Sequence, residues 1–343
     1  MPSYLRVVLT LLLAAAGGTV FAWAELPAPW LSGSMVAVAA VVLMGFRGEV
    51  PGRLRDLVFV FLGISMGAGV TPEAVAQLGR WPLSMIALAL LVAAVIAASS
   101  AYLRRVEGWD EPTAFFASVP GAMSHVMALT AASIADVRQV AMAQSFRVFI
   151  LVALLPAAIQ GTAPPPPPAP LSHSAALLEG PTALAVMLAA SAVGALLLHR
   201  LKVPGGLLLG SMAASALLHA FAIVLIPLPQ WLLIPGAVAL GAVIGARFNG
   251  TDMALIRSTF RASLGSFVVA FVIAVAFSLA VAALLQLPLG QVLLAFAPGG
   301  LEAMTFMAFV MKLDPAYVGG HQLARFVGIA LVLPLIARRH FRR

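Results

Sequence analysis

The stretch LAFAPGGLEAM, residues 294–304, interrupts a long apolar segment with one proline and two glycines. Proline removes a backbone donor and glycine is a poor helix former, so an unbroken helix is disfavoured at this point. A second stretch, FFASVPGAMSH at residues 115–125, places Pro-Gly in a similar apolar setting. Two interruptions of the same kind, far apart in one chain, are the main clue to the fold.

The composition is that of an integral membrane protein. Apolar residues make up 62% of the chain and charged residues only 9%, whereas soluble domains carry about 25% charged residues. We therefore expect an all-α polytopic protein in the lipid bilayer. The chain has no cysteine, which excludes disulfides, thiolate metal sites and cysteine nucleophiles. The net charge of +8 is typical of basic cytoplasmic loops, and we expect no direct binding of nucleic acid.

The chain contains an internal duplication. Shifted by 178 residues, its second half aligns with its first at the Pro-Gly motifs and at scarce polar residues. The aligned pairs are Pro120-Gly121 with Pro298-Gly299, Asp136 with Asp314, Gln144 with Gln322, and Arg147 with Arg325. We predict a first repeat at 1–160, a proline-rich linker at 161–178 and a second repeat at 179–343. The N-terminal 25 residues read as a signal peptide, but their match to an internal helix predicts that they are retained.

The distribution of basic residues predicts that the repeats are inverted. Each repeat has six apolar segments. If all six crossed the membrane, the basic loops at 47–55 and 104–105 would lie opposite those at 200–202 and 247–261. If the Pro-Gly segment is re-entrant, each repeat crosses five times and these loops share one side, as the positive-inside rule favours. We predict two inverted repeats, each of about five transmembrane helices plus a Pro-Gly-broken or re-entrant segment, with both termini cytoplasmic.

Asp136, Gln144 and Arg147 fall on one face of a helix, and Asp314, Gln322 and Arg325 repeat that face. We interpret the two aspartates as helix N-caps, since Asp314 precedes Pro315. The two arginines lie roughly 16 Å further along, near the bilayer centre, and must have partners there.

Three kinds of partner stay open for these arginines: carbonyls freed by the broken backbone, Glu302, or a bound anion. The counterpart of Glu302 is Ser124, so only the second repeat places an acid beside its interruption. We therefore expect Arg325→Ala to impair solute binding more than folding, with Arg147→Ala the milder change.

The histidines show no metal-ligand spacing. The six lie at positions 125, 173, 199, 219, 321 and 340, and we interpret His125 and His321 mainly as packing residues. We expect no metal and no cofactor.

On the two GSM segments, the Pro-Gly motifs and the Asp-x7-Gln-x2-Arg helix, the chain resembles the bacterial membrane AbrB-duplication family. That family is labelled an ammonia monooxygenase or a regulator of gene expression, and it shares its name with an unrelated small DNA-binding regulator. More distantly, the layout is similar to the cation–proton antiporter and anion transporter superfamily. This resemblance implies that Pro120-Gly121-Ala122 and Pro298-Gly299-Gly300 are tips of re-entrant hairpins, although the first lacks the Gly-Gly pair.

These observations together predict a secondary transporter of a small, anionic solute. The solute would bind where the repeats meet near the bilayer midplane, with Glu302 or His321 binding a coupling proton or Na⁺. The predicted binding residues are Pro120, Gly121, Ala122, Ser124, Gln144, Arg147, Pro298, Gly299, Gly300, Glu302, Gln322 and Arg325. A membrane regulator that acts indirectly on gene expression is the alternative, and a monooxygenase is disfavoured. We expect a multi-pass protein of the bacterial inner membrane, not an enzyme, and leave a homodimer open.

Overall fold

The computed structural model describes residues 3–68, 81–160, 178, 180–221, 223–224 and 230–341. Most of the predicted linker therefore lies outside the described residues. Over the described ranges the chain is helical, without β-strands. Six of the described helices are long and apolar enough to cross a membrane: Ser3–Trp23, Trp81–Arg105, Val137–Ile159, Gly180–Arg200, Met253–Leu285 and Pro315–Ala337. The protein is thus an all-α polytopic membrane protein, as its composition predicts.

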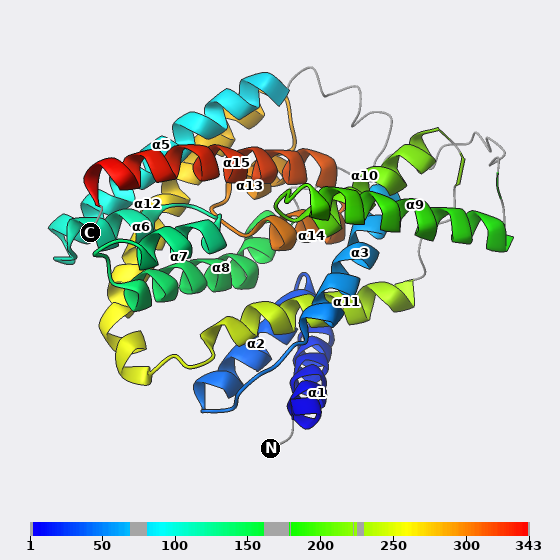
Figure 1. Ribbon diagram of the computed structural model, residues 1–343, viewed down its shortest axis with the longest axis horizontal. Coiled ribbons are helices and arrows are strands. Elements are labelled where there is room, and N and C mark those ends of the chain that lie inside the picture. Colours follow the sequence, from blue (N-terminus) through cyan, green and yellow to red (C-terminus); the bar gives the residue numbers. More distant parts are fainter. Residues whose placement is uncertain are drawn as a thin grey trace.

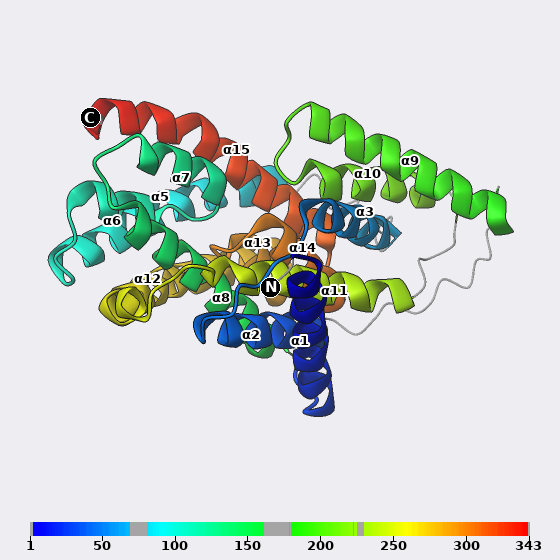
Figure 2. The same cartoon turned by 60° about the horizontal axis from the view of Figure 1, so that its bottom comes forward.

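The helices form two bundles, each built from both repeats (Figures 1 and 2). The first bundle contains α1 (Ser3–Trp23), α2 (Pro29–Leu43), α3 (Gly52–Ala68), α9 (Gly180–Arg200), α10 (Gly206–Ala220) and α11 (Gln230–Gly245), which the short helix η2 (Ala246–Phe248) extends. The second contains α5 (Trp81–Arg105), α6 (Glu111–Ser118), α7 (Met123–Ala131), α8 (Val137–Ile159), α12 (Met253–Leu285), α13 (Leu289–Phe296), α14 (Leu301–Val310) and α15 (Pro315–His340).

Glycine contacts hold the first bundle together, and they explain the two GSM segments. A Cβ atom on Gly33 of α2 would lie 2.4 Å from the Gly17 carbonyl oxygen of α1. In the second repeat, a Cβ atom on Gly210 of α10 would lie 2.2 Å from the Gly194 carbonyl oxygen of α9. Only glycine allows backbones to approach this closely, which is how helices in lipid gain packing contacts. The repeated motif therefore marks the same helix contact in both repeats.

Polar contacts between the repeats show that they are inverted. Helices α5 and α12 occupy the same position in the two repeats, and they pack together. Arg261 near the start of α12 forms an ion pair with Glu107, just after the end of α5, at 3.1 Å. Because the start of one helix lies beside the end of the other, these two equivalent helices run in opposite directions. In the first bundle, Asn249 after α11 donates to the Gly48 carbonyl oxygen before α3, at 2.6 Å.

The broken segment of the first repeat is a re-entrant hairpin. Its two arms are α6 and α7, which the turn around Pro120-Gly121 separates. After α7 the chain returns to its point of entry, because the backbone N–H of Asp136 donates to Thr113 Oγ1 of α6 at 2.8 Å. The segment thus enters and leaves on one side, which the sequence alone leaves open. In the second repeat, α13 and α14 flank Pro298–Gly300 in the corresponding way.

Candidate functional site

The two hairpin tips meet inside the second bundle. Gly121 adopts a φ of +79°, which glycine tolerates best. A Cβ atom at this position would lie 3.2 Å from Arg325 Nη2 and 3.5 Å from the Gly299 carbonyl oxygen. The tip of the first hairpin therefore touches the tip of the second and the arginine behind it, as the aligned Pro-Gly motifs predict.

In the first repeat, Gln144 and Arg147 of α8 bind the carbonyl groups at the open end of α6. The last carbonyls of a helix have no partner within it. Arg147 donates to the carbonyl oxygens of Val119 at 2.8 Å and Ala117 at 3.3 Å. Gln144 Nε2 donates to those of Val119 at 2.9 Å and Phe116 at 3.1 Å. The two side chains thus replace the helix turn that Pro120 prevents.

The second repeat uses the same arrangement at the end of α13. Arg325 Nη1 donates to the Ala297 carbonyl oxygen at 2.6 Å, and Nη2 donates to that of Gly299 at 2.8 Å. Gln322 Nε2 donates to the Leu294 carbonyl oxygen at 2.9 Å. In both repeats the arginine also donates to the glutamine Oε1. Of the three partners that the sequence leaves open, the freed carbonyls are the ones that the structure provides.

Both guanidinium groups are buried and repel each other. Across the described ranges, neither forms an ion pair with a carboxylate. Glu302 lines a cavity between the two bundles, and Arg325 is not among the residues that line it. Glu302 therefore gives no reason to expect that Arg325 binds solute. The geometry instead makes Gln144, Arg147, Gln322 and Arg325 anchors of the broken backbone, and their role in binding solute stays a prediction.

Both helices that carry these anchors begin at a capping aspartate. Asp136 Oδ1 accepts the backbone N–H groups of Arg138 at 2.8 Å and Gln139 at 3.1 Å. Asp314 Oδ1 accepts those of Ala316 at 2.8 Å and Tyr317 at 3.2 Å. These bonds satisfy N–H groups that the first turn of a helix leaves free.

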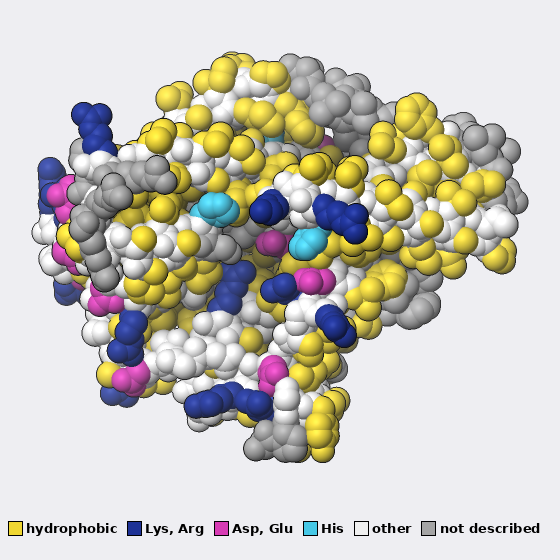
Figure 3. Space-filling view, in the orientation of Figure 1, with side chains coloured by type: hydrophobic (Ala, Val, Ile, Leu, Met, Phe, Trp, Pro, Cys, Tyr) yellow, Lys and Arg dark blue, Asp and Glu magenta, His cyan; other side chains and the backbone are white. Residues whose placement is uncertain are grey.

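A cavity of about 570 Å³ lies between the two bundles and reaches the second hairpin tip. Figure 3 shows a hollow near the centre of this face, with basic, acidic and histidine side chains around it. The polar residues that line the cavity are Arg55, Asp56, His199, Arg247 and Glu302. Gly300 and Ala303 of the second hairpin and Met123 of the first also line it. The site therefore combines charged side chains with the ends of two broken helices.

Both bundles contribute charged side chains to this cavity. Glu302 lies in the first turn of α14 and acts electrostatically on Arg247 of η2. The starts of α7 and α14 lack side-chain caps, and the N-terminus of a helix carries a partial positive charge that favours anions. The cavity can therefore offer Arg247 and two helix N-termini to an anionic group, and Glu302 to a cation or proton.

Apart from the four anchors and Gly121, the predicted site residues belong to the hairpins. Gly300 and Glu302 line the cavity, whereas Pro120, Ala122, Pro298 and Gly299 are buried in the tips. The side chain of Ser124 lies outside the described atoms.

Sequence reasoning missed Arg55, Asp56, His199 and Arg247. It counted the basic residues among them only as loop charges. The available signal for Arg247 was its position directly after the apolar run LGAVIGA, residues 240–246.

His321 does not line the cavity. Its side chain is fully buried, with Nε2 at 2.7 Å from Ser84 Oγ and Nδ1 at 2.8 Å from the Tyr317 carbonyl oxygen. Trp81 and Tyr317 pack against its ring. These contacts are those of a packing residue, and a role in coupling stays a prediction. Among the described residues, no three His, Asp or Glu side chains gather so as to hold a metal ion.

Fold and site together define a polytopic membrane protein of two inverted repeats, with hairpin tips that meet beside a charged cavity. The family described as "Transition state regulatory protein AbrB" matches residues 30–340, and the chain belongs to this AbrB family. This confirms the resemblance seen in the motifs.

Two relatives match along most of their length. One is "Putative regulator AbrB" of Escherichia coli K12, 26% identical over 92% of this chain and 90% of that protein. The other is "Uncharacterized protein YhjN" of Bacillus subtilis 168, 25% identical over 94% of this chain and 90% of that protein. No solved structure matches this chain.

Proposed function

We propose that this protein is a secondary transporter of a small, anionic solute. The observation that carries the proposal is the contact of two broken helical segments beside a cavity with Arg247 and Glu302. Broken backbone inside a membrane is tolerated where it is buried in protein or lines a water-filled space. In inverted-repeat transporters such segments form the binding site near the bilayer midplane.

Two features of the cavity support an anionic solute and a coupling ion. Arg247 and the starts of α7 and α14 supply positive charge for a carboxylate or phosphate group. Glu302 beside Gly300 supplies one carboxylate, which can bind a proton or Na⁺. The proposal includes the bacterial inner membrane as the location and the cytoplasm for both termini, because that orientation places the basic loops inside. It assigns no catalytic step to the chain.

A solute screen on the purified full-length chain tests this proposal. Melting temperatures would be measured with monocarboxylates, dicarboxylates, phosphate esters and amino acids, followed by uptake of each stabilising solute into proteoliposomes. Arg247→Gln should weaken solute binding about 10- to 150-fold, because a hydrogen bond to a charged group is worth about 1.5–3 kcal/mol. Arg257→Gln, at an exposed arginine of α12, is the matched control.

Glu302→Gln should retain solute binding but lose the dependence of uptake on a proton or Na⁺ gradient. Uptake that is unchanged in both cavity variants would contradict the assignment of this cavity.

A membrane regulator that acts indirectly on gene expression is the second candidate, favoured by the name of the Escherichia coli relative. Specific binding of a solute without any uptake would support the regulator instead.

A further inference from the structure

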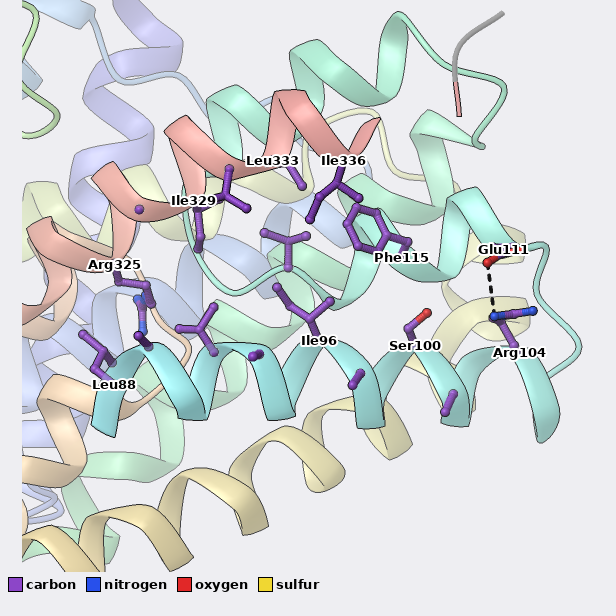
Figure 4. A pocket seen from close by; sticks show the side chains of 18 of the residues that line it. Leu88, Ile96, Ser100, Arg104, Glu111, Phe115, Arg325, Ile329, Leu333 and Ile336 are labelled. Carbon is purple, nitrogen blue, oxygen red and sulfur yellow. Dashed lines mark hydrogen bonds and ion pairs between the residues drawn. The ribbon is translucent and has the colours of Figure 1, made fainter. Parts of the chain in front are cut away.

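A second concavity, separate from the charged cavity, runs along the outside of the second bundle. It has a volume of about 950 Å³ and lies between α5, α6 and α15. Its floor is apolar and includes the buried side chains of Leu88, Val119, Ile329 and Leu333. Figure 4 shows Arg325 at one end of this groove and the Arg104–Glu111 ion pair at the other.

Small residues on α15 form part of the groove wall, and the aligned positions of the first repeat carry larger ones. The groove wall on α15 contains Ala324 and Gly328. The aligned positions on α8 carry Phe146 and Ile150, and Phe146 packs against Phe260 of α12 with ring centroids 5.2 Å apart. A Cβ atom on Gly328 would meet no atom within 4 Å. The aligned positions thus carry large side chains in the first repeat and small ones beside the groove in the second.

The dimensions of the groove fit a lipid acyl chain. Its α15 wall runs from Ala324 to Ile336, or about 18 Å at 1.5 Å per residue. The hydrocarbon of one leaflet is about 15 Å thick. The volume of about 950 Å³ divided by that length corresponds to a mean cross-section of about 50 Å², so the groove is long and narrow.

The charges at the outer end fit an anionic headgroup. Arg104 and Arg105 close α5, and both are exposed. Arg104 contacts Glu111 at 3.3 Å, but both side chains are about half exposed, so this pair is weak and leaves the arginine accessible. Trp109 lines the same end, and tryptophan is enriched at the level of lipid headgroups.

We propose that this groove binds one anionic phospholipid, with the phosphate at Arg104 and Arg105 and an acyl chain along α15 toward Arg325. The site goes beyond the proposed transport and does not depend on it. Its inner end is formed by Val119, at the end of α6, and by Arg325, which anchors the end of α13. A bound acyl chain would therefore pack against the backbone that supports both hairpin tips.

Lipid titration of the purified full-length chain in detergent tests this site. Phosphatidylglycerol or phosphatidylcholine would be added, and retained lipids and protein copies would be counted by native mass spectrometry. We expect one retained phosphatidylglycerol per protomer and much weaker retention of phosphatidylcholine. Replacing Arg104 and Arg105 together by Gln should weaken phosphatidylglycerol binding about 30-fold, since each cationic residue near anionic lipid contributes about 1 kcal/mol. The matched control replaces Arg200 and Lys202, at the end of α9, by Gln.

Two further variants test the apolar part of the groove. A Cβ atom on Gly328 has no neighbour within 4 Å, so Gly328→Leu should abolish the retained lipid without lowering the melting temperature in detergent. Ala189→Phe, at an exposed position of α9, is the control on another helix. Retention of phosphatidylglycerol by Gly328→Leu, or equal retention of both lipids by the unmodified chain, would overturn the proposal. If the unmodified chain shows the mass of a dimer and Gly328→Leu loses it, a second copy of the chain occupies the groove, and the proposal is overturned as well.

Discussion

Replacement of Arg325 by alanine should destabilise the protein strongly, even without solute. The side chain donates to the carbonyl oxygens of Ala297 at 2.6 Å and Gly299 at 2.8 Å, two residues that are both buried. A hydrogen bond from a charged donor contributes about 1.5–3 kcal/mol. Two such bonds correspond to a loss of about 3–6 kcal/mol, which relief of the repulsion from Arg147 reduces.

The corresponding loss in the first repeat should be smaller. Arg147 donates to Val119 at 2.8 Å, but its bond to Ala117 is long, at 3.3 Å, and its Nε atom has no partner. Arg147→Ala should therefore cost about 2–4 kcal/mol. The hydrogen bonds thus keep the order of severity that the sequence predicts, but they move the main effect from binding to stability.

Equilibrium unfolding in mixed detergent micelles, followed by circular dichroism, measures both losses. Leu331→Ala is the control, since this side chain lies on the same helix, is exposed and does not line the groove. Arg325→Lys should recover part of the stability, because one charged donor is kept. If Arg325→Ala unfolds at the same detergent fraction as Leu331→Ala, these hydrogen bonds do not stabilise the fold.

Three more predictions concern the hairpin tip, the first bundle and the topology. Gly121→Ala should cost about 1–3 kcal/mol in the same assay, because its φ is +79° and Arg325 Nη2 would lie 3.2 Å from the new Cβ atom. Gly108→Ala, with a φ of +70° but no atom within 4 Å, should cost less, and equal losses would argue against close contact at the tip. Gly63→Ala should prevent folding or lower yield sharply, since its Cβ atom would lie 2.3 Å from a carbonyl oxygen of α10; a normal melting temperature would contradict this packing. Single cysteines at Glu107 and Arg261, in this cysteine-free chain, should react with an impermeant reagent from the same side of the membrane, and labelling from opposite sides would rule out the inverted arrangement.

Much of the fold follows from local patterns in the sequence. Low charge and long apolar segments predict the membrane class, because each crossing helix must satisfy its own backbone in lipid. The repeated Pro-Gly motifs predict the interruptions, since proline and glycine act on the helix that contains them. Asp136 and Asp314 follow from capping rules for the same reason. The inversion is predicted by counting the basic residues that each topology would place on either side of the membrane, and this count needs no knowledge of helix packing.

The candidate site depended on contacts between distant helices. Arg247 and Glu302 lie in different bundles, so no spacing along the chain indicates that they line one cavity. The partners of Arg325 were equally undecided, because carbonyls, an acid and an anion all satisfy a buried guanidinium.

The sequence by itself determined the membrane class and the two broken segments, and it predicts the duplication and a common side for the basic loops. The first two rest on the residues of single segments, the duplication on an alignment of the two halves, and the common side on sums of charge. Only the tertiary structure decided that the first hairpin is re-entrant, that the two arginines bind backbone carbonyls, and that a groove opens beside α15. These outcomes depend on which helix surfaces meet when the two repeats pack together. The groove also depends on the volume that Gly328 leaves empty, at a position whose neighbours the packing of the whole bundle determines.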